Sequence, residues 1–102
     1  MSRTPIHPGV ILADELNELG ISASRLAREL QVPSNRISQI IAGKRAMTAD
    51  TALRLGRWFG TGPQLWMNLQ KIYELDLAIQ EHGKEIDTHV PLGRAEAMRA
   101  QA

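Results

Sequence analysis

The sequence contains no cysteine, no long apolar run and no recognisable targeting segment. Without cysteine, disulfides and thiolate metal sites are excluded, and the composition fits a reducing cytoplasm. No apolar run approaches the roughly 18 residues that a membrane span requires, and the N-terminus lacks a signal-peptide pattern. We therefore expect a cytoplasmic protein with no membrane association.

Residues suited to catalysis or metal binding are also scarce. There are three histidines, His7, His82 and His89. His82 and His89 are too far apart to be taken as a metal pair and have no third ligand nearby. A lone histidine beside Pro8 is typical of packing or capping. No nucleotide-binding glycine loop or nucleophile motif is present. We expect no enzyme, no metal and no cofactor; a small nuclease built on these histidines is the remote alternative.

Acidic residues are missing from one segment, and this asymmetry matters more than the formal net charge of +1. Residues 25–57 contain seven basic and two acidic side chains, and residues 33–48 contain no acid at all. The remainder of the chain carries five basic and nine acidic residues. Such concentration of positive charge on one segment indicates a nucleic-acid-binding surface.

Within this basic segment, two short apolar patterns predict a pair of helices. Leu26, Ala27 and Leu30 form the first pattern, and Ile37, Ile40 and Ile41 form the second. Pro33 disfavours helical backbone at the preceding residue, so the first helix should end near residue 31. Two short helices joined by a three-to-four-residue turn are typical of a helix-turn-helix.

The second helix of the pair has an outer face suited to contacting DNA. With the isoleucines turned inward, the candidate DNA-binding residues that remain are Ser34, Asn35, Arg36, Ser38 and Gln39, followed by Lys44 and Arg45, with Arg25 from the preceding helix. Asn and Gln can bond an adenine edge, Arg a guanine edge and Ser either, while Lys44 and Arg45 are placed for phosphates. The alternative is an ordinary solvated face, which is usually richer in Glu and Lys.

Three further helices are expected around this pair. A loose arm, residues 1–7, should precede a helix over 8–19 that Gly20 ends, and Thr48 should cap a fourth helix with Asp50 in its first turn. Pro63 should open a fifth helix that ends at Gly83 and is apolar over more than one face. This excess predicts a homodimer interface comprising Leu69, Ile72, Tyr73 and Leu77.

The chain therefore divides into two parts. Residues 1–80 should form an all-α, five-helix helix-turn-helix domain that includes the dimerising helix, and residues 81–102 a C-terminal extension. In that extension we expect 88–91 to be extended and 95–102, which has helix propensity but almost no apolar face, to be partly disordered or ordered only by a partner.

The run from Ser22 to Lys44 resembles the helix-turn-helix of the Xre and phage-repressor superfamily, of lambda-repressor-like type. With His7-Pro8-Gly9, Thr48 to Leu55 and the block Pro63-Gln64-Leu65-Trp66-Met67-Asn68-Leu69-Gln70, the resemblance over Ile6 to Leu77 narrows to HigA antitoxins of type II toxin–antitoxin pairs. One departure is Gln31, where the superfamily usually carries glycine. If that residue is left-handed, its side chain costs on the order of 1 kcal/mol.

The resemblance implies a biological role. HigA-like proteins bind operator DNA, neutralise a HigB-like toxin (a RelE-type, ribosome-dependent mRNA endonuclease) and repress their own operon. The operator is expected to be an inverted repeat contacted in the major groove by a homodimer. A stand-alone Xre-family repressor without a toxin is the main alternative. A basic toxin should dock on acidic residues outside the basic segment: Asp14, Glu15, Glu18, Glu74, Asp76, Glu81, Glu85 and Asp87.

Overall fold

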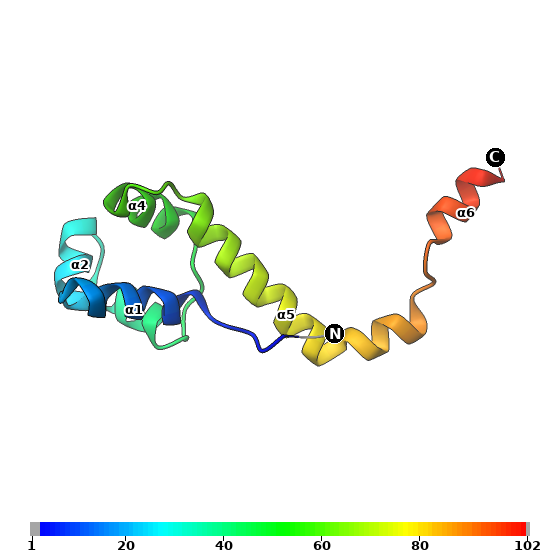
Figure 1. The fold of residues 1–102 in the computed structure, drawn as a ribbon, viewed down its shortest axis with the longest axis horizontal. Helices are drawn as coiled ribbons and strands as arrows, with labels where there is room; N and C mark the ends of the chain where they lie inside the picture. The colour runs from blue at the N-terminus through cyan, green and yellow to red at the C-terminus, as the bar shows by residue number, and fades with distance from the viewer. Residues whose placement is uncertain (1–2, 102) are drawn as a thin grey trace.

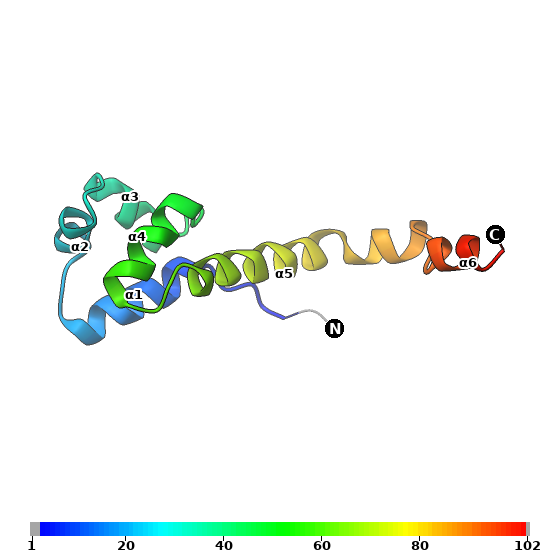
Figure 2. The ribbon, with the colours of Figure 1, turned by 90° about the horizontal axis from the view of Figure 1, so that it is seen from above.

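A computed structural model describes residues 3–101 and contains six helices in that range, with no strand. They are α1 (Pro8–Leu19), α2 (Ala23–Leu30), α3 (Ser34–Ile41), α4 (Ala49–Phe59), α5 (Gln64–His89) and α6 (Arg94–Ala100). The first four helices and the start of α5 form a compact bundle, from which the rest of α5 projects and carries α6 at its far end (Figures 1 and 2). The molecule is consequently elongated, with extents of 59 × 26 × 22 Å.

The all-α helix-turn-helix fold predicted from the sequence is confirmed. Helix α1 has the predicted bounds and ends at Gly20, whose left-handed backbone (φ 68°) closes the helix. Helix α2 begins after Ser22, whose hydroxyl accepts a hydrogen bond from the Arg25 amide. Gln31 is the only non-glycine residue with positive φ among those described (φ 61°, ψ 44°), as the helix-turn-helix pattern requires.

The core lies where the two helices of the motif meet α1, α4 and the start of α5. Its members are almost fully excluded from solvent: Leu12, Leu16, Leu26, Ala27, Leu30, Ile37, Ile40, Met47, Ala52, Leu55 and Trp66. Ala27 of α2, a small residue, is among them and is 1% exposed. Because α3 packs against both α1 and α2, its buried isoleucines fix which side of the helix faces outward.

The prediction that Gly83 ends the fifth helix is wrong, because α5 continues to His89. Gly83 does not adopt positive φ, and a single interior glycine weakens a helix by only about 1 kcal/mol without stopping it. The helix ends before Val90 instead, whose extended backbone (φ −99°, ψ 120°) precedes Pro91 as expected for a residue before proline. Thr88 and His89, expected to be extended, are therefore helical.

Two further expectations need correction: the first residue of α5 and the looseness of the N-terminal arm. Pro63 precedes α5 rather than forming its first residue. The arm, of which residues 1–2 lie outside the described part, is not loose over residues 3–7. It runs beside α5, where Arg3 pairs with Asp76 at 3.3 Å (Figure 1). Asp76 is consequently buried, at 6% exposure, and we withdraw it from the set of acids available to a toxin.

Candidate nucleic-acid interface

Helix α3 presents the outer face that the sequence predicted. Ile37 and Ile40 are fully buried beneath it, whereas Ser34, Asn35 and Ser38 are exposed. Ser38 donates its hydroxyl to the backbone carbonyl of Asn35 at 3.3 Å, and the side-chain amide of Asn35 makes no hydrogen bond within residues 3–101. The exposed amide of Asn35 can therefore bond an external partner with no internal bond to break.

Gln39 and Arg45 are brought together at the other end of the helix. Arg45 Nε donates to Gln39 Oε1 at 3.1 Å, although the two residues belong to the helix and to the loop after it. This bond fixes the orientation of the amide and leaves its Nε2 group, a donor, directed away from Arg45. The pair therefore supplies an oriented donor and an adjacent positive charge.

The loop of residues 42–48 carries the two predicted phosphate-binding side chains. Lys44 and Arg45 are both exposed. The Lys44 amide donates to the Gln39 carbonyl at 2.8 Å, and Gly43 takes a positive φ of 75° to make the turn. Both charges consequently sit directly beyond the end of α3, where a helix lying in a groove would bring them to the flanking backbone.

Arg36 lies at the edge of this surface and is already paired. Its Nη1 donates to Asp50 Oδ2 at 2.8 Å, and the same oxygen accepts from Arg54 Nε at 3.0 Å. The hydrogen bond from Arg54, followed by the charges of both arginines and the hydrogen bond from Arg36, lowers the pKa of Asp50 from its ordinary 3.8. Asp50, predicted only as a favourable first-turn acid, therefore also joins α3 to α4.

Arg25 is likewise engaged, on the α2 side of the surface. It donates to Glu29 at 3.0 Å, and Glu29 also accepts from the Trp58 indole at 2.9 Å. The Trp58 hydrogen bond and then the Arg25 contact lower the pKa of Glu29 from 4.5. Arg25 and Arg36 are thus held in place by acids, in contrast to the exposed Lys44.

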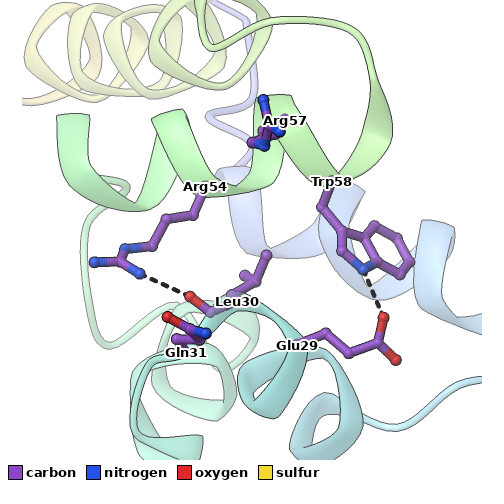
Figure 3. Close-up of a pocket in the computed structure, with 6 residues that line it drawn as sticks. All are labelled: Glu29, Leu30, Gln31, Arg54, Arg57 and Trp58. Carbon is purple, nitrogen blue, oxygen red and sulfur yellow. Dashed lines mark hydrogen bonds between the residues drawn. The ribbon is translucent and has the colours of Figure 1, made fainter.

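A shallow hollow of about 430 Å³ lies between the end of α2 and α4, lined by Glu29, Leu30, Gln31, Arg54, Arg57 and Trp58 (Figure 3). Two hydrogen bonds cross it: Trp58 donates to Glu29, and Arg54 Nη1 donates to the Leu30 carbonyl at 2.8 Å. These bonds join α2 to α4 beside the strained Gln31. The hollow therefore marks the place where α2 and α4 are bonded together. Arg54 contributes to this contact, a role that its position in the sequence did not indicate.

His7 has the capping role that the sequence suggested. Its Nδ1 accepts from the Gly9 amide at 2.9 Å, and its ring meets Tyr73 edge-on at 5.0 Å. Burial lowers the pKa of His7 from 6.5, and a hydrogen bond to the backbone of Arg45 opposes this shift. The neutral imidazole therefore joins α1, α5 and the loop after α3, a three-way contact that no sequence pattern indicated.

The proposed interface residues of α5 differ in their surroundings. Leu69 packs against the core, Tyr73 contacts His7, Leu77 is half-buried and Ile72 is 44% exposed. A longer apolar stripe lies along α5 at intervals of seven residues, comprising Leu65, Ile72, Ile79 and Ile86 with Leu75 beside it. Each member is at least 41% exposed, so this stripe is uncovered within one copy.

Residues 3–101 bring together no group of three or more His, Asp or Glu side chains that could hold a metal ion. No helix within the same range has the length and apolarity to cross a membrane.

Comparison with known proteins identifies relatives over most of the chain. A helix-turn-helix family model matches residues 12–66. Virulence-associated protein I of Dichelobacter nodosus is 47% identical over 88 residues, which cover 85% of this chain and 81% of that protein. The solved structure of a HigA-family addiction module antidote protein from Coxiella burnetii is 49% identical, with a TM-score of 0.85, covering 87% of this chain and 98% of that one. Antitoxin HigA of Pseudomonas aeruginosa, solved with the higBA promoter, is 46% identical, with a TM-score of 0.84, over 87% and 98%.

Proposed function

The chain belongs to the HigA-type antitoxins of the helix-turn-helix family, and on that premise we propose that it binds operator DNA, represses its own operon and neutralises a HigB-like toxin. The observation that carries the DNA-binding part is the outer face of α3 with the loop that follows. This surface combines an unengaged Asn35, an oriented Gln39 and the exposed Lys44, and residues 33–48 contain no acid. Because a protein that binds operator DNA must be in the same compartment as that DNA, we propose that it is cytoplasmic.

Within this surface, we assign two kinds of contact. Ser34, Asn35, Ser38 and Gln39 face base edges in the major groove, because they lie on the exposed side of α3. Lys44 and Arg45 bind phosphates, as does Arg25 at the edge. Arg36 reaches DNA only if its bond to Asp50 is shared or exchanged. Its contribution to DNA affinity therefore depends on Asp50.

We propose that the operator is bound by a homodimer. One α3 spans too few base pairs for useful specificity, and a twofold dimer would place two such helices about 34 Å apart, one turn of DNA. The apolar stripe of α5 supports this proposal, because a helix face with five exposed large aliphatic side chains requires a cover. Leu69, Tyr73 and Leu77 would then support the interface by packing within their own monomer.

The DNA-binding proposal is tested by separating the two kinds of contact. Asn35→Ala and Gln39→Ala should each cost about 1–3 kcal/mol at particular base pairs of the operator. Lys44→Ala should weaken binding to all sequences and reduce the salt slope by about one. Titration of each variant against the DNA upstream of its gene and against point-substituted versions provides the measurement. Unchanged sequence preference in both amide variants would remove α3 from its assigned role.

Neutralisation of a toxin is tested through acidic residues of α1 and α5. Because HigB-like toxins bind RNA, we propose docking on acidic groups of α1 or of the distal part of α5. Reversing Glu15 and Glu18, or Glu81 and Asp87, to lysine should slow association with the toxin, since rim charges act mainly on the association rate. Glu96→Lys in α6 is the control. Unchanged association at low salt in both double variants would move the site to the apolar surface.

A stand-alone repressor is the second candidate function, and the same DNA surface supports it. The two functions separate in cells that express a HigB-like toxin encoded beside this gene. An antitoxin restores growth of these cells, whereas a stand-alone repressor represses its promoter and leaves growth inhibited.

A further inference from the structure

The loop after α3 is held from inside the protein at Met47. The holding side chain is Gln70 of α5, whose Oε1 accepts from the Met47 amide at 2.8 Å. The His7 ring lies beside the same loop, with its Cγ atom 4.0 Å from the position that a Cβ atom on Gly43 would take. The Met47 side chain is itself in the core, at 2% exposure. Lys44 and Arg45 therefore project from a loop whose inner side is fixed.

Gln70 has an unusual position for a glutamine, because only 5% of its surface is exposed. Both ends of its amide are used: Oε1 accepts from Met47, and Nε2 donates to Glu74 Oε2 at 2.9 Å. A carboxylate can only accept, so Glu74 selects the amide orientation that directs Oε1 toward the loop. Glu74, Gln70 and the Met47 amide thus form a short relay from the surface of α5 to the loop.

From this relay we infer that Gln70 is a positioning residue for DNA binding, which sets the placement of Lys44 and Arg45 by holding the Met47 amide. The inference rests on the proposed binding of operator DNA. The Met47 amide is buried beside the core, where an unpaired donor is unfavourable. Without the Gln70 acceptor, the loop must shift to bring this amide to water, and the two positive side chains shift with it.

A purely structural Gln70 would behave differently. Loss of a buried hydrogen bond would then lower the stability of the folded state and leave the DNA affinity of the folded molecules unchanged. A positioning role instead predicts that affinity and loop order change together in protein that remains folded. It also predicts that the effect vanishes once the charges being positioned have been removed.

The main variant is Gln70→Met, which keeps the length of the side chain and removes the acceptor, with Gln80→Met on the exposed part of the same helix as its control. We expect Gln70→Met to lose about tenfold in affinity for all DNA sequences. The salt slope should fall, and hydrogen exchange at the Met47 amide should accelerate. In a background of Lys44→Ala with Arg45→Ala, the same change should have little further effect on affinity.

Rescue provides a second, independent test. The exchange Gln70→Glu with Glu74→Gln restores an acceptor toward Met47 and a donor from residue 74, with the same total charge. It should recover most of the Met47 protection and of the DNA affinity that Gln70→Met loses. If the Met variant does not fold, Glu74→Ala keeps Gln70 but frees its amide to rotate, with Glu96→Ala in α6 as the charge-matched control. Glu74→Ala should accelerate Met47 exchange and weaken DNA binding relative to Glu96→Ala.

Wild-type affinity and salt slope in folded Gln70→Met, or in Glu74→Ala relative to Glu96→Ala, would overturn the inference. These outcomes differ from failure of the proposed function, in which the wild-type protein itself shows no preference for any DNA sequence.

Discussion

Replacing Gly9 by alanine should destabilise the protein, although alanine favours a helix more than glycine does. Gly9 lies in the first turn of α1, directly against the last turn of α3. A Cβ atom at this position would lie 1.8 Å from the Ile40 carbonyl oxygen and 2.7 Å from its carbon. Since these are backbone atoms, relief requires α1 and α3 to separate by about 1.5 Å, the difference from an ordinary contact.

The two opposing effects can be compared in magnitude. Alanine gains at most about 1 kcal/mol over glycine from helix propensity, and less in a first turn. Overpacking of a close contact costs typically about 1–3 kcal/mol, and here the rigid neighbour places it at the upper end. The net effect is a loss of about 1–2 kcal/mol, which lowers the melting temperature by roughly 5–15 °C. Because α3 is displaced, DNA affinity should decrease as well.

Gly83→Ala is the matched control in α5. Its Cβ would lie 3.5 Å from Ile79 Cγ2, an ordinary contact, so only the propensity gain of about 0.5–1 kcal/mol remains. Urea or thermal denaturation of the two variants should therefore give shifts of opposite sign. A Gly9→Ala protein as stable as Gly83→Ala would refute the close packing of α1 on α3.

Three further predictions concern pH, charge and assembly. Because burial lowers the pKa of His7, its imidazole takes up a proton more readily in the unfolded chain than in the folded protein. The free energy of unfolding should therefore be unaffected by this histidine above about pH 6.5 and should fall as the pH decreases below that value. Urea denaturation at pH 7.5 and 5.5 should show this dependence, and His7→Asn, which can still cap α1, should lack it. Asp50→Asn releases Arg36 and should raise affinity for random-sequence DNA with a steeper salt slope; an unchanged slope would mean that Arg36 stays away from DNA. Ile72→Asp with Ile79→Asp should give a folded monomer in sedimentation experiments, and a dimer that survives both changes would place the interface elsewhere.

The local signals in the sequence were sufficient for the fold of the bundle. Proline and glycine positions predicted the ends of α1 and α2, and the left-handed Gln31 followed from the motif alone. The prediction that Gly83 ends α5 was wrong because glycine ends a helix only when its backbone becomes left-handed, which depends on the residues that follow. Here Pro91 decided the end, since it forces Val90 out of the helical region.

The candidate site was predictable in its composition and not in its internal bonds. The spacing of isoleucines indicated which side chains of α3 face outward. It could not indicate that Asp50 holds Arg36, or that Gln70 holds the Met47 amide across 23 positions of sequence. Such contacts depend on how α4 and α5 pack against the motif. A buried glutamine and an exposed one are indistinguishable in the amino-acid sequence.

We expect two copies of the protein to place their α3 helices in successive major grooves of an inverted repeat. The most direct test measures affinity for the operator before and after insertion of five base pairs between its half-sites, which rotates one half-site by about half a turn of DNA. We expect a loss of at least about tenfold, because only one α3 can then engage its half-site. The same five base pairs added outside the repeat should have no effect. Equal affinity for all three DNAs would contradict twofold binding through α3.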